Sequence, residues 1–300
     1  MTPTKQRRLF GISILIFVIL MLIATFWDRQ ISNLLINHRS IFGTVFQTFG
    51  LFPPYLILIV SGQIALTYAL RGQINPFFGW IFGLGGMGLS GWTLKTYLDH
   101  VENYIVSIQT NLIYHKPIGL ANNDRQTLTF SRGQAYLTWI VTFIVITILF
   151  QYWLKRYGLK TIKKLILVAV FACLTVGFTY LVNMGLKDIW GRVRPYELNN
   201  SQSNFTNWLT INGINGHHSF PSGHAKSAAL LIVFSWFFKG KARLIWWIIG
   251  VVYGVLMCLS RIVIGAHFAS DVIFSFFLTA LIVYIARMIY LSVIGRQEKN

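Results

Sequence analysis

Two histidines and one aspartate are the side chains of this sequence best suited to phosphorus chemistry. His267 precedes Asp271 by four residues, a spacing that puts both on one face of a helix within contact distance. The carboxylate can then fix the tautomer of the imidazole, which makes His267 a candidate nucleophile that attacks phosphorus and forms a phosphohistidine. His224, at the start of another apolar run, can protonate the leaving oxygen as a general acid. The two histidines would divide the two tasks.

Three cationic side chains would bind the phosphate itself. Lys187, Arg194 and Arg261 supply positive charge, and the two arginines can present paired N–H donors to phosphate oxygens. Ser222 and Gly223 directly precede an apolar run, so their hydroxyl and backbone N–H groups would lie at a helix N-terminus, which favours an anion. The eight acidic residues are scattered singly, unlike the convergent ligands of two-metal phosphatases. We therefore expect neither a metal site nor a cofactor.

Taken singly, these residues have less specific explanations. Arg261 alone would more often be a topology anchor, His267 alone an interfacial histidine, and Ser222-Gly223 an ordinary helix start. We interpret Arg192 as an anchor. The remaining histidines are interpreted as loop or interfacial residues: His38, His100, His115, His217 and His218. The joint pattern decides, because ionisable residues at membrane depth are costly and these all suit one chemical task.

The elements that must position these residues are membrane helices. The chain has 300 residues, of which 55% are hydrophobic and 11% charged, whereas soluble domains carry roughly 25% charged residues. Runs near the length of a membrane span occur at 9–27, 52–70, 77–97, 136–154, 165–186, 223–238, 244–261 and 267–290. The first run lacks a small-residue cleavage site and predicts a retained anchor. The glycines of 77–97 predict close helix contact.

The basic residues predict the orientation. Lys and Arg, 26 in all, are concentrated in short connectors that are cytoplasmic if the N-terminus is inside, so both termini are expected in the cytoplasm. The three polar clusters then lie at the outer ends of spans, beside long outer loops at 98–135 and 187–222. The net charge of +18 is explained by topology and a phosphate site, and no nucleic-acid partner is expected.

The three clusters together resemble a known signature. In order and spacing they are similar to that of the type-2 phosphatidic acid phosphatase superfamily: Lys, six residues, Arg-Pro; then Pro-Ser-Gly-His; then Ser-Arg, five residues, His, three residues, Asp. Every position is filled across Lys187 to Asp271. The resemblance implies metal-independent hydrolysis with His267 as nucleophile paired with Asp271 and His224 as acid. Phosphate binding falls to Lys187, Arg194, Ser222, Gly223 and Arg261.

The resemblance also sets expectations for the whole chain. The expected fold is an all-α polytopic membrane bundle, in which two extra spans on the N-terminal side join a six-helix phosphatase core. Residues 1–164 would form an N-terminal transmembrane region and 165–300 the catalytic core. The expected location is a bacterial cytoplasmic (inner) membrane, with the site on the extracytoplasmic side.

The expected partner is a lipid phosphate in the bilayer, and the sequence leaves its identity open. Candidates are phosphatidate or phosphatidylglycerol phosphate, undecaprenyl pyrophosphate, and lipid A. A soluble sugar phosphate is a further possibility. The alternatives are a phosphotransferase that passes the phosphate to a second lipid or sugar, and a non-catalytic lipid transporter or scaffold. An intact motif set argues against the last, and the oligomeric state stays undetermined.

Overall fold

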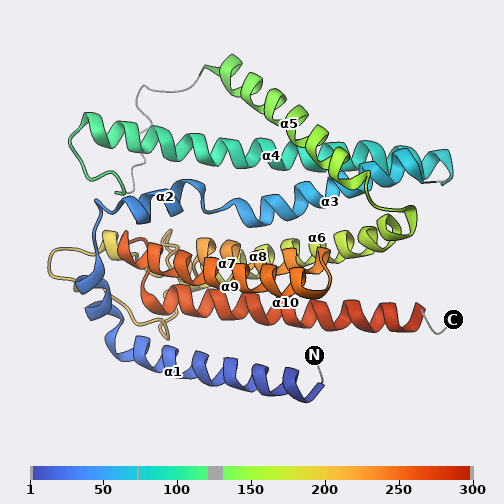
Figure 1. Ribbon diagram of the computed structural model, residues 1–300. Coiled ribbons are helices and arrows are strands. Elements are labelled where there is room, and N and C mark those ends of the chain that lie inside the picture. The colour runs from blue at the N-terminus through green and yellow to red at the C-terminus, as the bar shows by residue number, and fades with distance from the viewer. Residues whose placement is uncertain (1–2, 73, 121–130, 298–300) are drawn as a thin grey trace.

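The computed structural model describes residues 3–72, 74–120 and 131–297, and the regular structure in these ranges is entirely helical (Figure 1). The helices are α1 (Pro3–Leu35), α2 (Ile41–Phe49), α3 (Phe52–Arg71), α4 (Pro76–Ile113), α5 (Arg132–Leu154), α6 (Leu159–Trp190), α7 (Gly223–Ala229), α8 (Leu231–Phe234), α9 (Gly240–Val263) and α10 (Ala269–Gln297), with single 3-10 turns η1 (Pro195–Glu197) and η2 (Ser235–Phe237). The prediction of an all-α bundle is confirmed.

Six segments of the described residues are long and apolar enough to cross a membrane: Phe10–Leu35, Ile41–Arg71, Arg132–Leu154, Leu159–Glu197, Gly240–Val263 and Ala269–Ile294. Their outward faces are apolar, as in Leu15 and Phe26 of α1 or Leu137 and Ile148 of α5, which are all more than half exposed. Such surfaces suit acyl chains, and helices satisfy their own backbone groups in hydrocarbon. The chain is an integral membrane protein.

Two of the eight predicted spans differ from this set. The run 223–238 does not form one spanning helix but breaks into α7, α8 and η2. The run 77–97 lies in α4, a helix that is absent from the six candidate spans because its many glycines lower its hydropathy. The prediction of a span at 223–238 as one helix was therefore wrong, whereas the run 77–97 is helical as expected and its crossing of the membrane stays a prediction.

The predicted outer loop 98–135 is a second correction. Helix α4 continues through residue 97 to Ile113, and α5 already begins at Arg132. Residues 121–130 of this predicted loop lie outside the described residues. The loop was predicted from the point where the apolar run ends. A helix can continue past that point as long as its backbone hydrogen bonds are formed. The predicted domain boundary at 164/165 lies in the first two turns of α6.

A close approach of backbones joins α4 to α3. A Cβ added at Gly86 would lie 2.5 Å from the carbonyl oxygen of Gly62, so only glycine fits there. By contrast, Gly79, Gly85 and Gly88 face nothing within 4 Å. The expected role of glycine in helix contact thus applies to Gly86 and not to these three neighbours.

The connectors at one end of the bundle position the polar clusters. The loop between α6 and α7 lies at the left-hand end of the bundle in Figure 1. Helix α10 ends at the opposite end, and the start of α1 lies towards that opposite end too. The loop leaves α6 at Gly191, whose φ of 51° is left-handed. Glycine adopts this conformation without steric cost, and it ends the helix there.

Candidate active site

All three clusters meet at this end of the bundle. Lys187 comes from the last turn of α6, Ser222 caps the N-terminus of α7, and Asp271 lies in the first turn of α10. The backbone N–H of Ser222 donates to the carbonyl of Asp271 at 3.1 Å, which ties α7 to α10. Lys187 Cε lies 3.8 Å from the position of a Cβ at Gly223. The structure therefore brings segments separated by more than 80 residues into one site.

The carboxylate of Asp271 is held from several sides. Its Oδ1 accepts from Arg192 Nη1 at 2.6 Å, and its Oδ2 accepts from Ser219 Oγ at 2.6 Å and from the backbone N–H of Phe268 at 2.8 Å. The last bond is that of an acidic residue reaching back to the residue before its helix. His267 Nδ1 lies 3.7 Å from the same Oδ2, which is beyond hydrogen-bond distance. His267 thus faces Asp271 as expected, without the bond.

His267 is buried and His224 is partly buried with its Nε2 shielded from solvent, and burial penalises the charged form of both. Burial lowers the pKa of His267 to about 3, although the neighbouring Asp271 opposes this. Burial also lowers the pKa of His224 well below its usual value, and the charges of Arg261 and Arg194 lower it further. Both imidazoles are therefore neutral at pH 7 in this structure, which suits a nucleophile directly.

The arginine of the third cluster is anchored from α2. Arg261 is buried, and its Nη1 and Nη2 donate to Gln47 Oε1 at 3.3 Å and to the carbonyl of Gly43 at 3.1 Å. Its Nε has no hydrogen-bond partner, and the same holds for His224 Nε2 and His267 Nδ1 within the described part of the chain. Buried polar atoms are normally paired. The unpaired Nδ1 of His267 faces Asp271. The unpaired atoms of Arg261 and His224, two side chains that interact electrostatically, indicate a place for a polar ligand.

Two further cations share one acceptor. Lys187 Nζ donates to the carbonyl of His218 at 2.8 Å, and Arg194 Nη2 approaches the same oxygen at 3.5 Å. The carbonyl holds the two side chains together without neutralising their charge. With Arg261 they form a cationic cluster around two neutral imidazoles, and such a cluster favours a phosphate.

No group of three or more His, Cys, Asp or Glu that could hold a metal ion occurs among residues 3–72, 74–120 and 131–297. Asp271, which faces His267, and Asp28 both bond to Arg192.

Sequence reasoning missed Arg192 and Asp28. Interpreting Arg192 as an interfacial anchor was wrong, because its side chain is fully buried and bonds to two carboxylates. Asp28 comes from α1, where it is a lone acid at the end of an apolar run. An ionisable residue at membrane depth is a signal of function that would have found it.

Two other residues of the site were not predicted. Ser219 lies in the loop before α7 and bonds to Asp271. Tyr104 stacks edge-to-face on His224 with ring centroids 6.2 Å apart, and it is placed there by the extension of α4 past residue 97. Hydropathy does not predict this extension of α4, which is why Tyr104 was assigned to a loop.

The remaining histidines have contacts of their own. His217 Nδ1 lies 3.0 Å from Glu197 Oε2, and His38 Nδ1 lies 2.9 Å from the carbonyl of Ile264. His100, which was expected in a loop, lies in α4 and packs on Tyr55.

The part of the chain that carries most of these residues resembles known proteins. A family model described as the PAP2 superfamily matches residues 168–293. A lipid A 4'-phosphatase of Francisella tularensis subsp. novicida (strain U112) is 30% identical over 166 residues, which cover 53% of this chain and 72% of that relative. No solved structure matches the chain significantly.

Proposed function

This chain belongs to the PAP2 superfamily, and on that premise we propose that it removes phosphate from a lipid A type substrate through a phosphohistidine on His267. It is a lipid phosphatase, that is, a phosphoric ester hydrolase of the membrane. The observation that carries the proposal is the pair of neutral histidines, buried His267 and partly buried His224, beside a cationic cluster. Among the candidate lipids, the relative named a lipid A 4'-phosphatase favours lipid A.

In the first step, His267 attacks phosphorus while a phosphate monoester lies among Lys187, Arg194 and Arg261. Asp271 faces Nδ1, so the lone pair of Nε2 forms the P–N bond and the bond from phosphorus to the lipid oxygen breaks. Ser222 and Gly223 contribute a hydroxyl and backbone N–H groups at the start of α7. We call Lys187, Arg194 and Arg261 the phosphate cradle, and removing positive charge from it weakens binding of the phosphate.

His224 supplies the proton that the leaving lipid oxygen needs. The negative charge of a bound phosphate raises the pKa of this imidazole, so it binds a proton together with the substrate. In the second step neutral His224 takes a proton from water, the hydroxide oxygen attacks phosphorus, and the P–N bond breaks. The products are the lipid alcohol and inorganic phosphate; His267 is free again, and His224 carries a proton as it did in the substrate complex and gives it up when phosphate leaves.

The proposed location is a bacterial inner membrane, with the site on the extracytoplasmic side and both termini in the cytoplasm. The concentration of Lys and Arg in short connectors on the side of the termini supports this orientation. It also agrees with the bundle, where the site loop lies opposite the end of α10 (Figure 1). A headgroup phosphate can then enter at the bilayer surface while the acyl chains stay in hydrocarbon.

The test is phosphate release by purified protein from four lipids: lipid A, phosphatidylglycerol phosphate, phosphatidate and undecaprenyl pyrophosphate. We expect wild type to act on lipid A and His267→Gln to lose at least about 1,000-fold in kcat, as when a catalytic nucleophile is removed. His115→Asn is the control, because His115 has φ 53° and Asn tolerates that conformation. Equal activity of wild type and His267→Gln would refute the mechanism.

The phosphotransferase alternative is separated by products. Free phosphate in amounts equal to the lipid alcohol indicates hydrolysis, whereas a second lipid or sugar that carries labelled phosphate indicates transfer. A non-catalytic transporter would release none.

A further inference from the structure

Asp28 caps the N-terminus of a helix to which it does not belong. It lies on α1, 242 residues before Ser270, yet its Oδ1 accepts from the backbone N–H of Ser270 at 2.9 Å and its Oδ2 accepts from the Ser270 hydroxyl. Ser270 is in the first turn of α10, where backbone N–H groups have no partner within the helix. A carboxylate is also the group that the positive end of a helix favours. Asp28 thus holds the start of α10.

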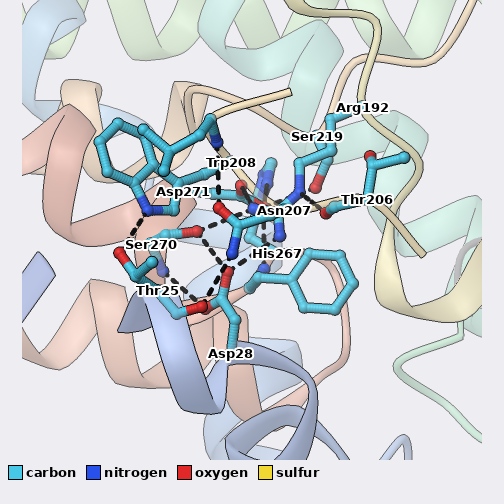
Figure 2. Close-up of polar contacts among 12 residues, drawn as sticks. Thr25, Asp28, Arg192, Thr206, Asn207, Trp208, Ser219, His267, Ser270 and Asp271 are labelled. Carbon is cyan, nitrogen blue, oxygen red and sulfur yellow. Dashed lines mark hydrogen bonds and ion pairs between the residues drawn. The ribbon is translucent and has the colours of Figure 1, made fainter. Parts of the chain in front are cut away.

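Arg192 joins this cap to the catalytic carboxylate. Its Nη2 donates to Asp28 Oδ2 at 2.9 Å, and its Nη1 donates to Asp271 Oδ1 at 2.6 Å and to Ser270 Oγ at 2.8 Å (Figure 2). Its Nε donates to the carbonyl of Thr206 at 2.9 Å. Every nitrogen of the guanidinium therefore has a partner, and the side chain is fully buried.

The aromatic rings around Arg192 and a second attachment of α1 fix this arrangement. The guanidinium carbon lies 4.3 Å from the ring centroid of Phe268, the residue between His267 and α10. One helical turn before Asp28, Thr25 accepts from Asn207 and Trp208 of the loop that carries Arg192 (Figure 2). The end of α1, the loop and the start of α10 are thereby joined as one polar unit.

Such a unit is an expensive way to join helices. Two carboxylates and one guanidinium have been taken out of water, and apolar side chains of similar volume often join helices as well or better. What the charges add is direction, since short charge-assisted bonds from one planar guanidinium to two carboxylates fix the position of each carboxylate. One of these two carboxylates, that of Asp271, faces His267.

We propose that Asp28 and Arg192 are positioning residues of the phosphatase reaction, which hold Asp271 and through it His267 in the orientation of attack. The proposal rests on the role of His267 proposed above. It also makes α1 part of the active site, although α1 lies outside residues 168–293, which match the family model. Asp28 and Arg192 themselves touch neither substrate nor phosphate.

The Asp28→Asn variant isolates the charge. Asparagine keeps the size and one acceptor oxygen for the backbone N–H of Ser270, but it offers Arg192 no charge, so the guanidinium is drawn to Asp271 alone. We expect kcat to fall about 10- to 100-fold, as for other outer residues that orient an active group. KM should change by less than about 3-fold, because the cradle of Lys187, Arg194 and Arg261 is untouched.

Two inhibitors separate positioning from loss of structure. Inorganic phosphate needs only the cradle, whereas vanadate takes up a five-coordinate form when a nucleophile such as His267 binds it, and so resembles the transition state. In Asp28→Asn we expect Ki for phosphate to stay within about 3-fold and Ki for vanadate to rise in proportion to the loss of kcat. A loosened fold would weaken both inhibitors together.

Further variants guard against misfolding. Asp28→Asn leaves Arg192 and Asp271 as a matched buried pair, whereas removing Arg192 would leave a buried carboxylate without its cation, so Asp28→Asn is the variant expected to fold. Arg192→Lys keeps the charge but reaches only one carboxylate, so an intermediate loss is expected. Asp99→Asn is the matched control, because Asp99 pairs with Lys95 on the exposed face of α4, and wild-type values are expected for it.

The proposal fails if folded Asp28→Asn and Arg192→Lys both keep wild-type kcat, or if phosphate and vanadate weaken equally in every variant at the site. The function itself is tested separately by wild type and His267→Gln in the same lipid assay. Wild type inactive on all lipids refutes the proposed function, and the ratio of the dissociation constants of vanadate and phosphate, which direct binding measures without turnover, still decides the positioning role.

Discussion

The Nδ1 atom of His267 lies 3.7 Å from Oδ2 of Asp271, and that oxygen already accepts two hydrogen bonds, from Ser219 and from the backbone of Phe268. The carboxylate is therefore fixed before the imidazole engages it. A small rotation of the imidazole about its own bonds would close the gap, whereas the carboxylate has little freedom to move. The aspartate acts as a fixed reference to which the nucleophile aligns.

Ser219 should matter for turnover although it is no part of the nucleophile. A hydrogen bond to a charged group contributes about 1.5–3 kcal/mol, and losing part of this in the transition state corresponds to a reduction of roughly tenfold in kcat for Ser219→Ala. Steady-state kinetics on the preferred lipid measure it. Ser292→Ala, at the exposed end of α10, is the control, and wild-type kcat in Ser219→Ala would show that Ser219 does not hold Asp271.

Phosphate binding should take up a proton at His224. Burial lowers the pKa of this imidazole, with further lowering by Arg261 and Arg194, whereas a bound phosphate anion raises it. Since the complex has the higher pKa, affinity for phosphate should increase as pH falls through the pKa of the complex. Calorimetry in buffers of different ionisation enthalpy counts the protons bound.

The matched variant for this experiment is His224→Gln. Inorganic phosphate titrates near neutral pH itself, so the difference between the two proteins isolates the histidine. We expect wild type to take up close to one proton more than His224→Gln. Identical proton uptake by the two would exclude His224 as the proposed acid.

Two neighbouring glycines of α4 should respond in opposite directions. Gly86→Ala places a methyl group 2.5 Å from the carbonyl of Gly62, and overpacking of this kind costs about 1–3 kcal/mol. Gly85 faces nothing within 4 Å, so Gly85→Ala should be neutral or stabilising by up to about 1 kcal/mol, from helix propensity. Thermal unfolding in detergent compares them, and equal melting temperatures would contradict the packing of α3 on α4.

Chelators should leave phosphate release unchanged. The described residues include no cluster of metal-binding side chains, and the cradle uses cations in place of a metal ion. Activity after dialysis against EDTA is the measurement, with a metal-dependent phosphatase assayed alongside to show that the chelator works. Loss of activity that added divalent ions restore would count against the cradle as the source of the positive charge.

Several features of this protein follow from its sequence alone. Apolar runs near the thickness of a bilayer determine a helical membrane bundle, because unsatisfied backbone groups are too costly in hydrocarbon for other structures. The spacing of Lys187, Arg194, His224, Arg261, His267 and Asp271 indicates the phosphate chemistry, because each type has a distinct task. The four-residue interval between His267 and Asp271 even predicts that they face each other, since local helix geometry decides it.

Only the tertiary structure shows which residues hold these catalytic side chains in place. The apolar run ends at residue 97, so hydropathy cannot show that α4 continues to Ile113 and brings Tyr104 to His224. Asp28 and Arg192 are 164 residues apart, and in the sequence each is one isolated charge among several. The packing of α1 against α10 decides which of these charges come into contact. The contact indicates their function, because a buried charge is tolerated only where the fold supplies its partner.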